Sequence, residues 1–221
     1  MNKDNSNDRA DESEDIFMAR ASLILTLRQH AIVNPAILKA FEVIPHEVFV
    51  PKEYAQYAYK DKTLPIGFGQ SMTSPVHLAK LFMALEPEGA KTLLEIGTGS
   101  GYCAAVLSRL ARRIFSVEKI NTLSHNAQEN WAKARIGRTI GFCHDGLLGL
   151  EAQAPFERIL LSGSVKEIPK VFFEQLSDGG ILVAPVGMPN ERQIITKVER
   201  VGDEFITTEC GFIRISALKN K

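Results

Sequence analysis

Residues 92–102 read Thr-Leu-Leu-Glu-Ile-Gly-Thr-Gly-Ser-Gly-Tyr, and this stretch decides the fold of the chain. Its first five residues form a short, mostly apolar segment of β-forming residue types, as in a strand that is buried on both faces of a parallel sheet. Gly97, Gly99 and Gly101 then remove every Cβ from one side of the next turn, so backbone can pass close to a ligand. We therefore predict a strand, a ligand-binding glycine loop and a helix.

The spacing of these glycines narrows the class of ligand. A dinucleotide-binding fingerprint has its third glycine three positions after its second, whereas Gly101 follows Gly99 by two. No Lys-Ser or Lys-Thr follows the loop, so a phosphate-binding P-loop is excluded. The charge of Glu95, just before the loop, would repel a pyrophosphate but suits a ligand with an ammonium or sulfonium group.

A second acid follows the next predicted strand, at residues 114–117. At that strand end the carboxylate of Glu118 can accept hydrogen bonds from both hydroxyls of a ribose. A glycine turn alone is as often only a turn, and Glu118 alone suits a solvated strand end. The order of strand, loop, helix, strand and acid, however, predicts an adenosyl ligand with a cationic tail, namely S-adenosylmethionine.

Composition limits the partners. The 221 residues include 26 Lys plus Arg and 26 Asp plus Glu, a formal net charge of zero, which leaves no electrostatic footprint for nucleic acid or an anionic membrane. No apolar run approaches the roughly eighteen residues of a membrane span, and the amino terminus lacks the basic and apolar regions of a secretory signal. We expect a cytoplasmic protein.

Cysteines and histidines give no sign of a disulfide or metal framework. Cys103, Cys143 and Cys210 lie far apart with no Cys-x-x-Cys pair, so we expect them to be reduced and mostly buried. The five histidines show no ligand spacing with cysteines or acids, so no metal site is predicted.

The amino-terminal part divides into a tail and a helical layer. Residues 1–14 are polar and rich in Asn and Asp, so we expect a disordered tail. A helix follows from residue 15, and its predicted core-facing residues are Ile16, Phe17, Ala21, Ile24 and Leu25. Asn34-Pro35 and Ser74-Pro75 each combine an N-cap with a helix-starting proline, and residues 48–74 between those helices are expected to form a long, ordered, functional loop.

Strands and helices alternate through the rest of the chain, which predicts a parallel sheet with right-handed crossovers. Further helices are predicted at residues 121–134 and 171–176, and further strands at 139–143, 158–162 and 180–185. Residues 193–201 and 204–215 alternate apolar and polar side chains around Gly202-Asp203, which predicts an antiparallel hairpin. We expect one α/β domain over residues 15–221, with a helical segment at 15–90 and a ligand-binding core at 91–221.

Several motifs resemble those of the protein-L-isoaspartate O-methyltransferases. The most specific is Leu-Pro-Ile-Gly-Phe-Gly-Gln within residues 58–75, since most class I methyltransferases share the glycine loop at 94–102. Residues 44–51, 154–159 and 175–187 are similar as well, so the likeness covers residues 24–218. It implies a Rossmann-like class I methyltransferase that repairs damaged proteins by methylating the stray α-carboxylate of isoaspartyl residues with S-adenosylmethionine.

The resemblance also implies roles for particular residues. Those implied for the donor are Glu95, Gly97, Gly99 and Gly101 at its methionine part, Glu118 at its ribose, and Asp145 with Gly146 at its adenine, and Thr98, Ser100 and Lys119 are implied as further donor-binding residues. A plain turn is the alternative for residues 145–146. The family's catalytic serine position falls on Thr73, and the implied substrate-binding residues are Gln70, Ser71, Met72, Ser74 and Arg214.

Methyl transfer from a sulfonium to a carboxylate requires few catalytic groups from the protein. A sulfonium is already a strong leaving group and a carboxylate already a nucleophile, so the site has mainly to align oxygen, methyl carbon and sulfur. A dedicated general base is not required. A hydroxyl that positions the carboxylate, and walls that exclude water, are sufficient.

The chain departs from the family pattern mainly on the acceptor side. Thr73 stands for the usual serine, residues 162–167 replace a Thr-Ala-Ala stretch, Arg214 stands where a proline is expected, and His144 replaces a glycine. Arg214 suits either a carboxylate substrate or a solvated edge strand. A methyltransferase for another carboxylate or a small molecule therefore stays open, as does a non-enzymatic donor-binding protein, and a dehydrogenase is a distant further alternative.

Overall fold

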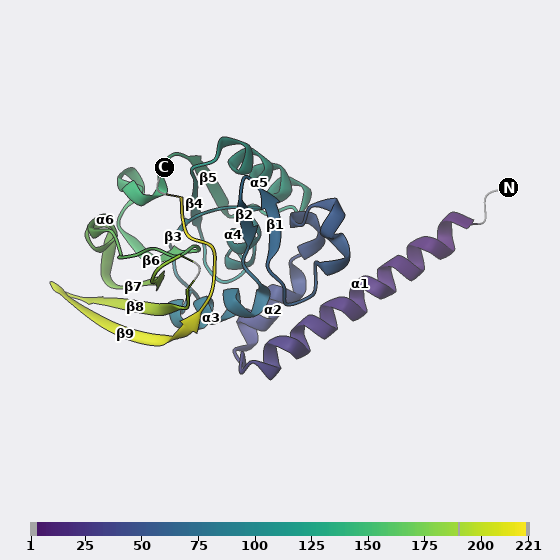
Figure 1. The fold of residues 1–221 in the computed structure, drawn as a ribbon, viewed down its shortest axis with the longest axis horizontal. Coiled ribbons are helices and arrows are strands. Elements are labelled where there is room, and N and C mark those ends of the chain that lie inside the picture. The colour runs from purple at the N-terminus through teal and green to yellow at the C-terminus, as the bar shows by residue number, and fades with distance from the viewer. Residues whose placement is uncertain (1–3, 190, 220–221) are drawn as a thin grey trace.

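A seven-stranded sheet organises the molecule. The computed structural model describes residues 4–189 and 191–219. The strands are β3 (Leu93–Ile96), β4 (Ile114–Glu118), β5 (Thr139–Cys143), β6 (Phe156–Leu161), β7 (Leu176–Val186), β8 (Gln193–Val201) and β9 (Glu204–Ile213), in the order β5-β4-β3-β6-β7-β8-β9. The first five strands of this order pair in parallel and the last two antiparallel (Figure 1). The predicted Rossmann-like sheet and its carboxyl-terminal hairpin are confirmed.

Both faces of the sheet are covered because the central strands are apolar on both sides. Leu93 and Ile114 belong to a core shared with α2 (Pro35–Val43), α3 (Pro75–Leu85) and α4 (Tyr102–Leu107). Their neighbours Leu94 and Phe115 point into a second core, which includes Phe172 of α6 (Lys170–Glu174). Successive residues of a strand face opposite sides, so this division gives each residue of β3 a known face.

The connections place a crevice at the carboxyl ends of β3 and β4. From β3 the chain passes through α4 to β4 and through α5 (Asn121–Lys133) to β5, and then returns to the other side of β3 as β6. Strand order therefore reverses at β3, and open α/β sheets bind ligands outside the carboxyl ends of strands at such a reversal. Short 3-10 turns, η3 (Gly146–Leu148) and η4 (Glu151–Gln153), follow β5 at this edge.

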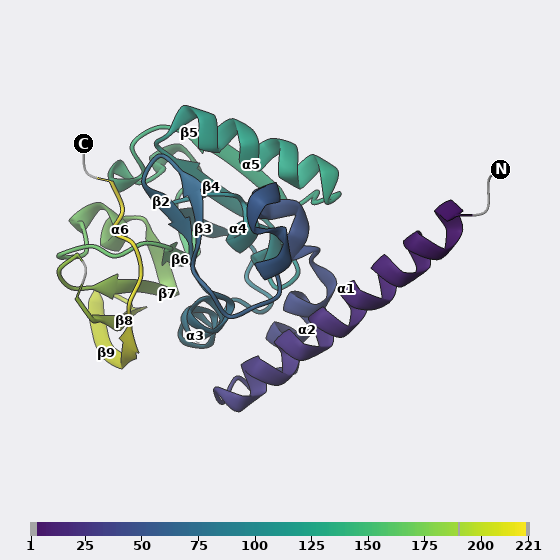
Figure 2. The ribbon, with the colours of Figure 1, turned by 45° about the vertical axis from the view of Figure 1, so that its right-hand side comes forward.

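Helix α1 (Asp4–Gln29) begins earlier than the sequence predicts. Residues 4–14, which are expected to belong to a disordered tail, lie within this helix, and residues 1–3 lie outside the described residues. Low apolar content argues against a packed element, but a helix satisfies its own backbone hydrogen bonds and can extend beyond its packed part. Figures 1 and 2 both show the amino-terminal end of α1 projecting from the rest of the molecule.

The buried stripe of α1 also differs from the predicted one. Phe17 and Leu25 are 67% and 60% exposed, whereas Leu23 and Leu27 are buried. The helix packs against α2 and α3. The position of those two helices selects the buried stripe, and apolar periodicity alone did not reveal it.

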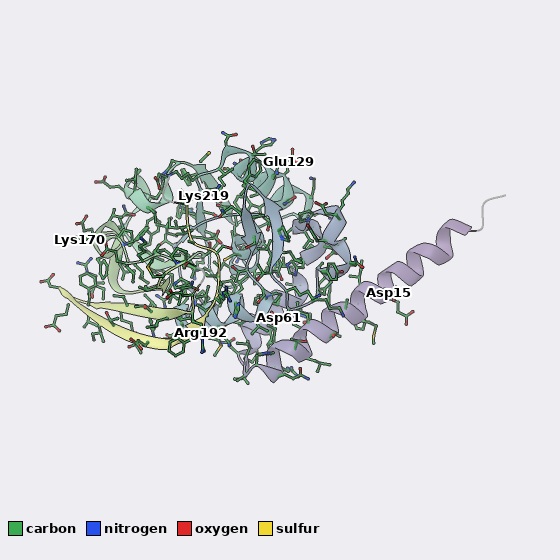
Figure 3. The ribbon with its side chains drawn as sticks, in the orientation of Figure 1. Asp15, Asp61, Glu129, Lys170, Arg192 and Lys219 are labelled. Carbon is green, nitrogen blue, oxygen red and sulfur yellow. The ribbon has the colours of Figure 1, made fainter. Side chains whose placement is uncertain are left out.

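Helix α3 starts at the predicted proline but takes its cap from elsewhere. Ser74 stands at the N-cap and makes no side-chain cap hydrogen bond. Instead Asp61 Oδ1 accepts from the backbone N–H of Val76 at 2.9 Å (Asp61 is labelled in Figure 3). By contrast, Asn34 caps α2 as predicted, through its side-chain oxygen.

The predicted long loop at residues 48–74 contains short regular elements. Two 3-10 helices, η1 (His46–Phe49) and η2 (Lys52–Tyr57), precede a small hairpin of β1 (Leu64–Gly67) and β2 (Gln70–Met72). This hairpin was not among the predicted elements. Its tip, residues 67–69, has positive φ throughout, at 84°, 53° and 67°.

The exposure of the cysteines differs from the prediction, and the helices can be checked for a membrane span. Cys103 is buried, but Cys143 and Cys210 are exposed, so the expectation of mostly buried cysteines is wrong. Cys143 ends β5 and Cys210 lies in β9, and these are the two edge strands of the sheet. In the part of the chain that the structure describes, no helix is long and apolar enough to cross a membrane.

Candidate functional site

Three small cavities of about 40 to 50 Å³ each adjoin one another at the carboxyl ends of β3 and β4. Gly97 lines all three, which places the glycine loop at their junction. The first cavity is also lined by Thr98, Gly99 and Ser100, the second by Glu118, Lys119, Asp145 and Gly146, and the third by Gln70, Ser71, Thr73 and Glu118. Residues predicted to bind donor and acceptor are thus brought together.

The glycine loop is held in a conformation that a larger residue would disturb. Gly97 has φ 99°, and a Cβ there would lie 2.7 Å from Ser162 Oγ and from Leu218 Cδ2. Gly101 has φ 88°, and a Cβ there would lie 2.7 Å from Trp131 Nε1. Both positions combine a left-handed backbone with a close neighbour, so both require glycine.

Helix α5 fixes the back of this loop. Trp131 Nε1 donates to the backbone oxygen of Gly101 at 2.8 Å, and Asn130 Nδ2 donates to that of Ser100 at 3.0 Å. The oxygen of Gly101 also accepts from the backbone N–H of Ala105 at 3.0 Å, so these side chains add to the backbone hydrogen bonds of the loop. The loop therefore keeps its shape independently of a ligand.

Glu118 lies at the end of β4, as predicted, but its carboxylate already has protein partners. Its Oε2 accepts from the backbone N–H of Gly99 and its Oε1 from that of Ile120, both at 2.9 Å. The side chain is buried and lines two of the cavities. Each carboxylate oxygen has further lone pairs, so Glu118 can join the glycine loop and accept from ligand hydroxyls.

The second cavity carries a charge pair. Lys119 Nζ donates to Asp145 Oδ2 at 2.6 Å, and this bond is the main reason that the pKa of Asp145 is lowered. Asp145 Oδ1 also accepts from the backbone N–H of Leu147 and so caps η3. A Cβ on Gly146 would lie 2.7 Å from Ile96 Cγ2, so glycine lets this turn close onto the end of β3.

Two predicted donor residues, Glu95 and Gly101, line none of the cavities described above, and Glu95 is the one that lies deepest in the core. It is fully buried in β3, on the face that α4 covers, and Ser116 Oγ of β4 donates to its Oε2 at 2.5 Å. Burial raises its pKa to about 7. A direct contact between this carboxyl group and a ligand is therefore not what the geometry offers.

The predicted acceptor residues fall into two groups. Ser71 and Thr73 line the first and third cavities, Met72 the first, and Gln70 the second and third. Ser74 is buried at the start of α3, and Arg214 is exposed after β9, and neither lines these cavities. The structure thus brings four of the six residues to the site.

The carboxyl-terminal segment forms a wall that the sequence analysis missed. Residues 216–218 line the third cavity, and Ser216 Oγ lies 2.7 Å from Ser71 Oγ. Lys219 Nζ donates to the backbone oxygen of Phe68 at the hairpin tip, at 2.8 Å (Figure 3). Nothing in the local sequence signals this role, because the segment reaches the site only by crossing back over the sheet after β9 (Figure 1).

Two departures from the family pattern have a structural explanation. Ser162 Oγ lies 2.9 and 2.6 Å from the backbone oxygens of Ile96 and Gly97 and can donate its single proton to either, so it supports the start of the glycine loop. His144 Nδ1 lies 3.1 Å from the backbone oxygen of Asp145. Both residues shape backbone around the cavities.

Comparisons with known proteins agree with this geometry. The family model described as protein-L-isoaspartate(D-aspartate) O-methyltransferase matches residues 18–219. A protein-L-isoaspartate O-methyltransferase of Maricaulis maris is 41% identical and covers 89% of this chain and 92% of its own, and one of Methanospirillum hungatei is 38% identical over 87% and 88%.

Solved structures show the same fold. One described as a protein-L-isoaspartate O-methyltransferase has a TM-score of 0.81 and 26% identity, over 91% of this chain and 66% of its own. A Plasmodium falciparum structure described as a putative member, in complex with S-adenosyl-L-homocysteine, has a TM-score of 0.78 at 16% identity, over 90% and 98%, and supports the fold alone. Sequence and fold together therefore place this chain in the protein-L-isoaspartate(D-aspartate) O-methyltransferase family.

Proposed function

We propose that this protein transfers a methyl group from S-adenosylmethionine to the α-carboxylate of L-isoaspartyl residues in damaged proteins. The observation that carries the proposal is the shared wall of the first and third cavities. Ser71 and Thr73, which directly follow the most specific motif, line these cavities together with Gly97 and Gly99 of the glycine loop. An acceptor held by those hydroxyls would therefore lie next to a donor held by the loop.

The donor residues divide into three tasks. We assign Gly97, Thr98, Gly99 and Ser100 to the methionine part, Glu118 to the ribose, and Asp145 and Gly146, with Lys119 beside them, to the adenine. Gly101 shapes the loop from behind, against Trp131. When bound, the donor supplies a methyl group on a sulfonium leaving group. The side-chain acceptors Glu118 and Asp145 suit the hydroxyl and amino groups of an adenosyl ligand.

The acceptor-side residues position the substrate carboxylate and do not have to activate it. A carboxylate is ionised at neutral pH, so no side chain has to remove a proton from it. The hydroxyl of Thr73 can donate to one carboxylate oxygen and leave the other directed at the methyl carbon. Ser71, already paired with Ser216, would hold the other side of the acceptor. The hairpin and the carboxyl-terminal segment both line the third cavity and would shield the bound acceptor from water.

The test compares two peptides that differ at one residue. Purified protein is incubated with labelled S-adenosylmethionine and a peptide that carries either isoaspartate or ordinary aspartate at the same position. Label on the isoaspartyl peptide alone is the expected result. Donor binding in calorimetry without transfer to that peptide would contradict the proposal and indicate another acceptor or binding alone.

The cytoplasmic location stays a prediction and is tested separately, by cell fractionation.

A further inference from the structure

A chain of three buried polar side chains runs from the first cavity into the core. Thr98, which lines the cavity, has its Oγ1 2.6 Å from Ser116 Oγ, and Ser116 Oγ donates to Glu95 Oε2 at 2.5 Å. All three side chains are buried, Ser116 and Glu95 completely. Ser116 lies within the strand predicted at residues 114–117 and was not among the predicted site residues.

The direction of these hydrogen bonds follows from counting protons. Glu95 Oε2 accepts the one hydroxyl proton of Ser116 when the carboxyl group is ionised or carries its proton on Oε1, and Thr98 then donates its own proton to Ser116. The oxygen of Thr98 then keeps only lone pairs for the cavity. It can accept a hydrogen bond from a ligand N–H group but cannot donate one to a carboxylate.

We propose that Ser116 is a positioning residue that couples the cationic end of the methyl donor, through Thr98, to the buried carboxyl group of Glu95, which releases its proton when the donor binds. The group that Thr98 recognises is the ammonium of the methyl donor, because its N–H groups can donate to the Thr98 oxygen. The O–H bond of the Glu95 carboxyl group breaks, its electrons stay on the carboxylate, and the proton passes to the buffer. This inference rests on the donor site proposed above.

The surroundings of Glu95 make its charge sensitive to a nearby cation. Burial raises its pKa to about 7, the nearby thiol of Cys103 on α4 and the hydrogen bond from Ser116 lower it, and the charge of Glu118 at the end of β4 raises it. Cys103 and Glu118 are the titratable groups that face it from those elements. Its Oε1 has no hydrogen-bond partner among the described residues. Adding one positive charge nearby favours the ionised form.

The sign of the pH dependence follows. The free protein holds the Glu95 proton up to about pH 7, whereas the complex loses it at a lower pH. Between these values binding releases a proton, so donor affinity rises as pH increases towards 7 and levels off above it. Without Ser116 the pKa of Glu95 in the free protein rises further. The pH above which donor affinity stops rising is then higher.

The experiment is titration calorimetry at pH 6, 7 and 8 in two buffers of different ionisation enthalpy. The ligands are S-adenosylmethionine, S-adenosylhomocysteine, which keeps the ammonium, and methylthioadenosine, which lacks it. We expect proton release at pH 7 with the first two ligands only. Ser116→Ala should raise the dissociation constant of S-adenosylmethionine about tenfold at pH 7. Glu95→Gln should abolish both the release and the pH dependence.

One control variant and two contradicting results are defined for this experiment. Ser124→Ala removes another buried serine, on α5 outside the site, and should bind as the wild type does. Wild-type affinity and pH profile in Ser116→Ala, or proton release by Glu95→Gln, would overturn the inference. If Ser116→Ala does not fold, Thr98→Val removes the same hydroxyl link at similar volume. Because the assay measures binding, a failure of isoaspartyl methylation would leave its result intact.

Discussion

The donor side and the acceptor side of the site are built in different ways. The donor side consists of consecutive residues 95–101 and the ends of neighbouring strands, and backbone groups and buried side chains hold it, as in the bond from Gly99 N–H to Glu118. The acceptor side is made of two distant segments, the β1–β2 hairpin and residues 216–219, which meet through half-buried or exposed groups such as Ser71 and Ser216. A buried, local arrangement should tolerate less change than an exposed, assembled one.

The largest expected effect is on the donor side. Gly101→Ala combines a left-handed residue with a collision against Trp131 and should lower the free energy of unfolding by about 3 kcal/mol. Gly89→Ala is the matched control, because Gly89 also has positive φ but a Cβ there would meet no atom within 4 Å, and it should cost about 1 kcal/mol. Urea denaturation measures both. Equal losses would mean that packing around the glycine loop is not tight.

The next effect concerns donor affinity. Glu118→Ala removes a carboxylate that accepts from two backbone N–H groups, and should raise the dissociation constant of S-adenosylmethionine about a hundredfold. Glu157→Ala is its control, since Glu157 also accepts a backbone N–H, from Lys91, but at the opposite end of the strands. Calorimetry that finds the same affinity for both variants would contradict a donor role for Glu118.

A smaller effect is expected on the acceptor side. Thr73→Ala should lower kcat for an isoaspartyl peptide about tenfold, because it loses one positioning hydrogen bond, and should leave donor affinity within about twofold. Thr73→Ser keeps the hydroxyl and should retain activity, while Thr63→Ala, at an exposed threonine, should change nothing. A Thr73→Ser variant as slow as Thr73→Ala would show that the methyl group, not the hydroxyl, is what the site uses.

The smallest effect tests a residue that the structure leaves outside the site. Arg214 is exposed and lines none of the three cavities, so Arg214→Ala should change kcat/KM by less than about twofold. Peptides with acidic and with neutral flanking residues should give the same result. A tenfold loss confined to isoaspartyl peptides would restore the role that the resemblance implies for Arg214 and extend the acceptor side towards β9.

The sequence by itself determined the strands of the sheet, their mostly parallel direction and the donor loop. Strand period, glycine spacing and an acid after a strand are local signals, because each concerns residues that are neighbours along the chain. Leu93–Ile96, Ile114–Glu118 and the hairpin of β8 and β9 accordingly lie where their patterns predict. The N-cap at Asn34 is of the same local kind.

Only the tertiary structure decided which side chains meet. The cap of α3 by Asp61, the pairing of Ser71 with Ser216, and the buried chain from Thr98 through Ser116 to Glu95 join residues that are 15, 145 and up to 21 positions apart. The buried stripe of α1 depends in the same way on where α2 and α3 pack. No periodicity encodes such contacts, since they arise from how strands and helices cross in space.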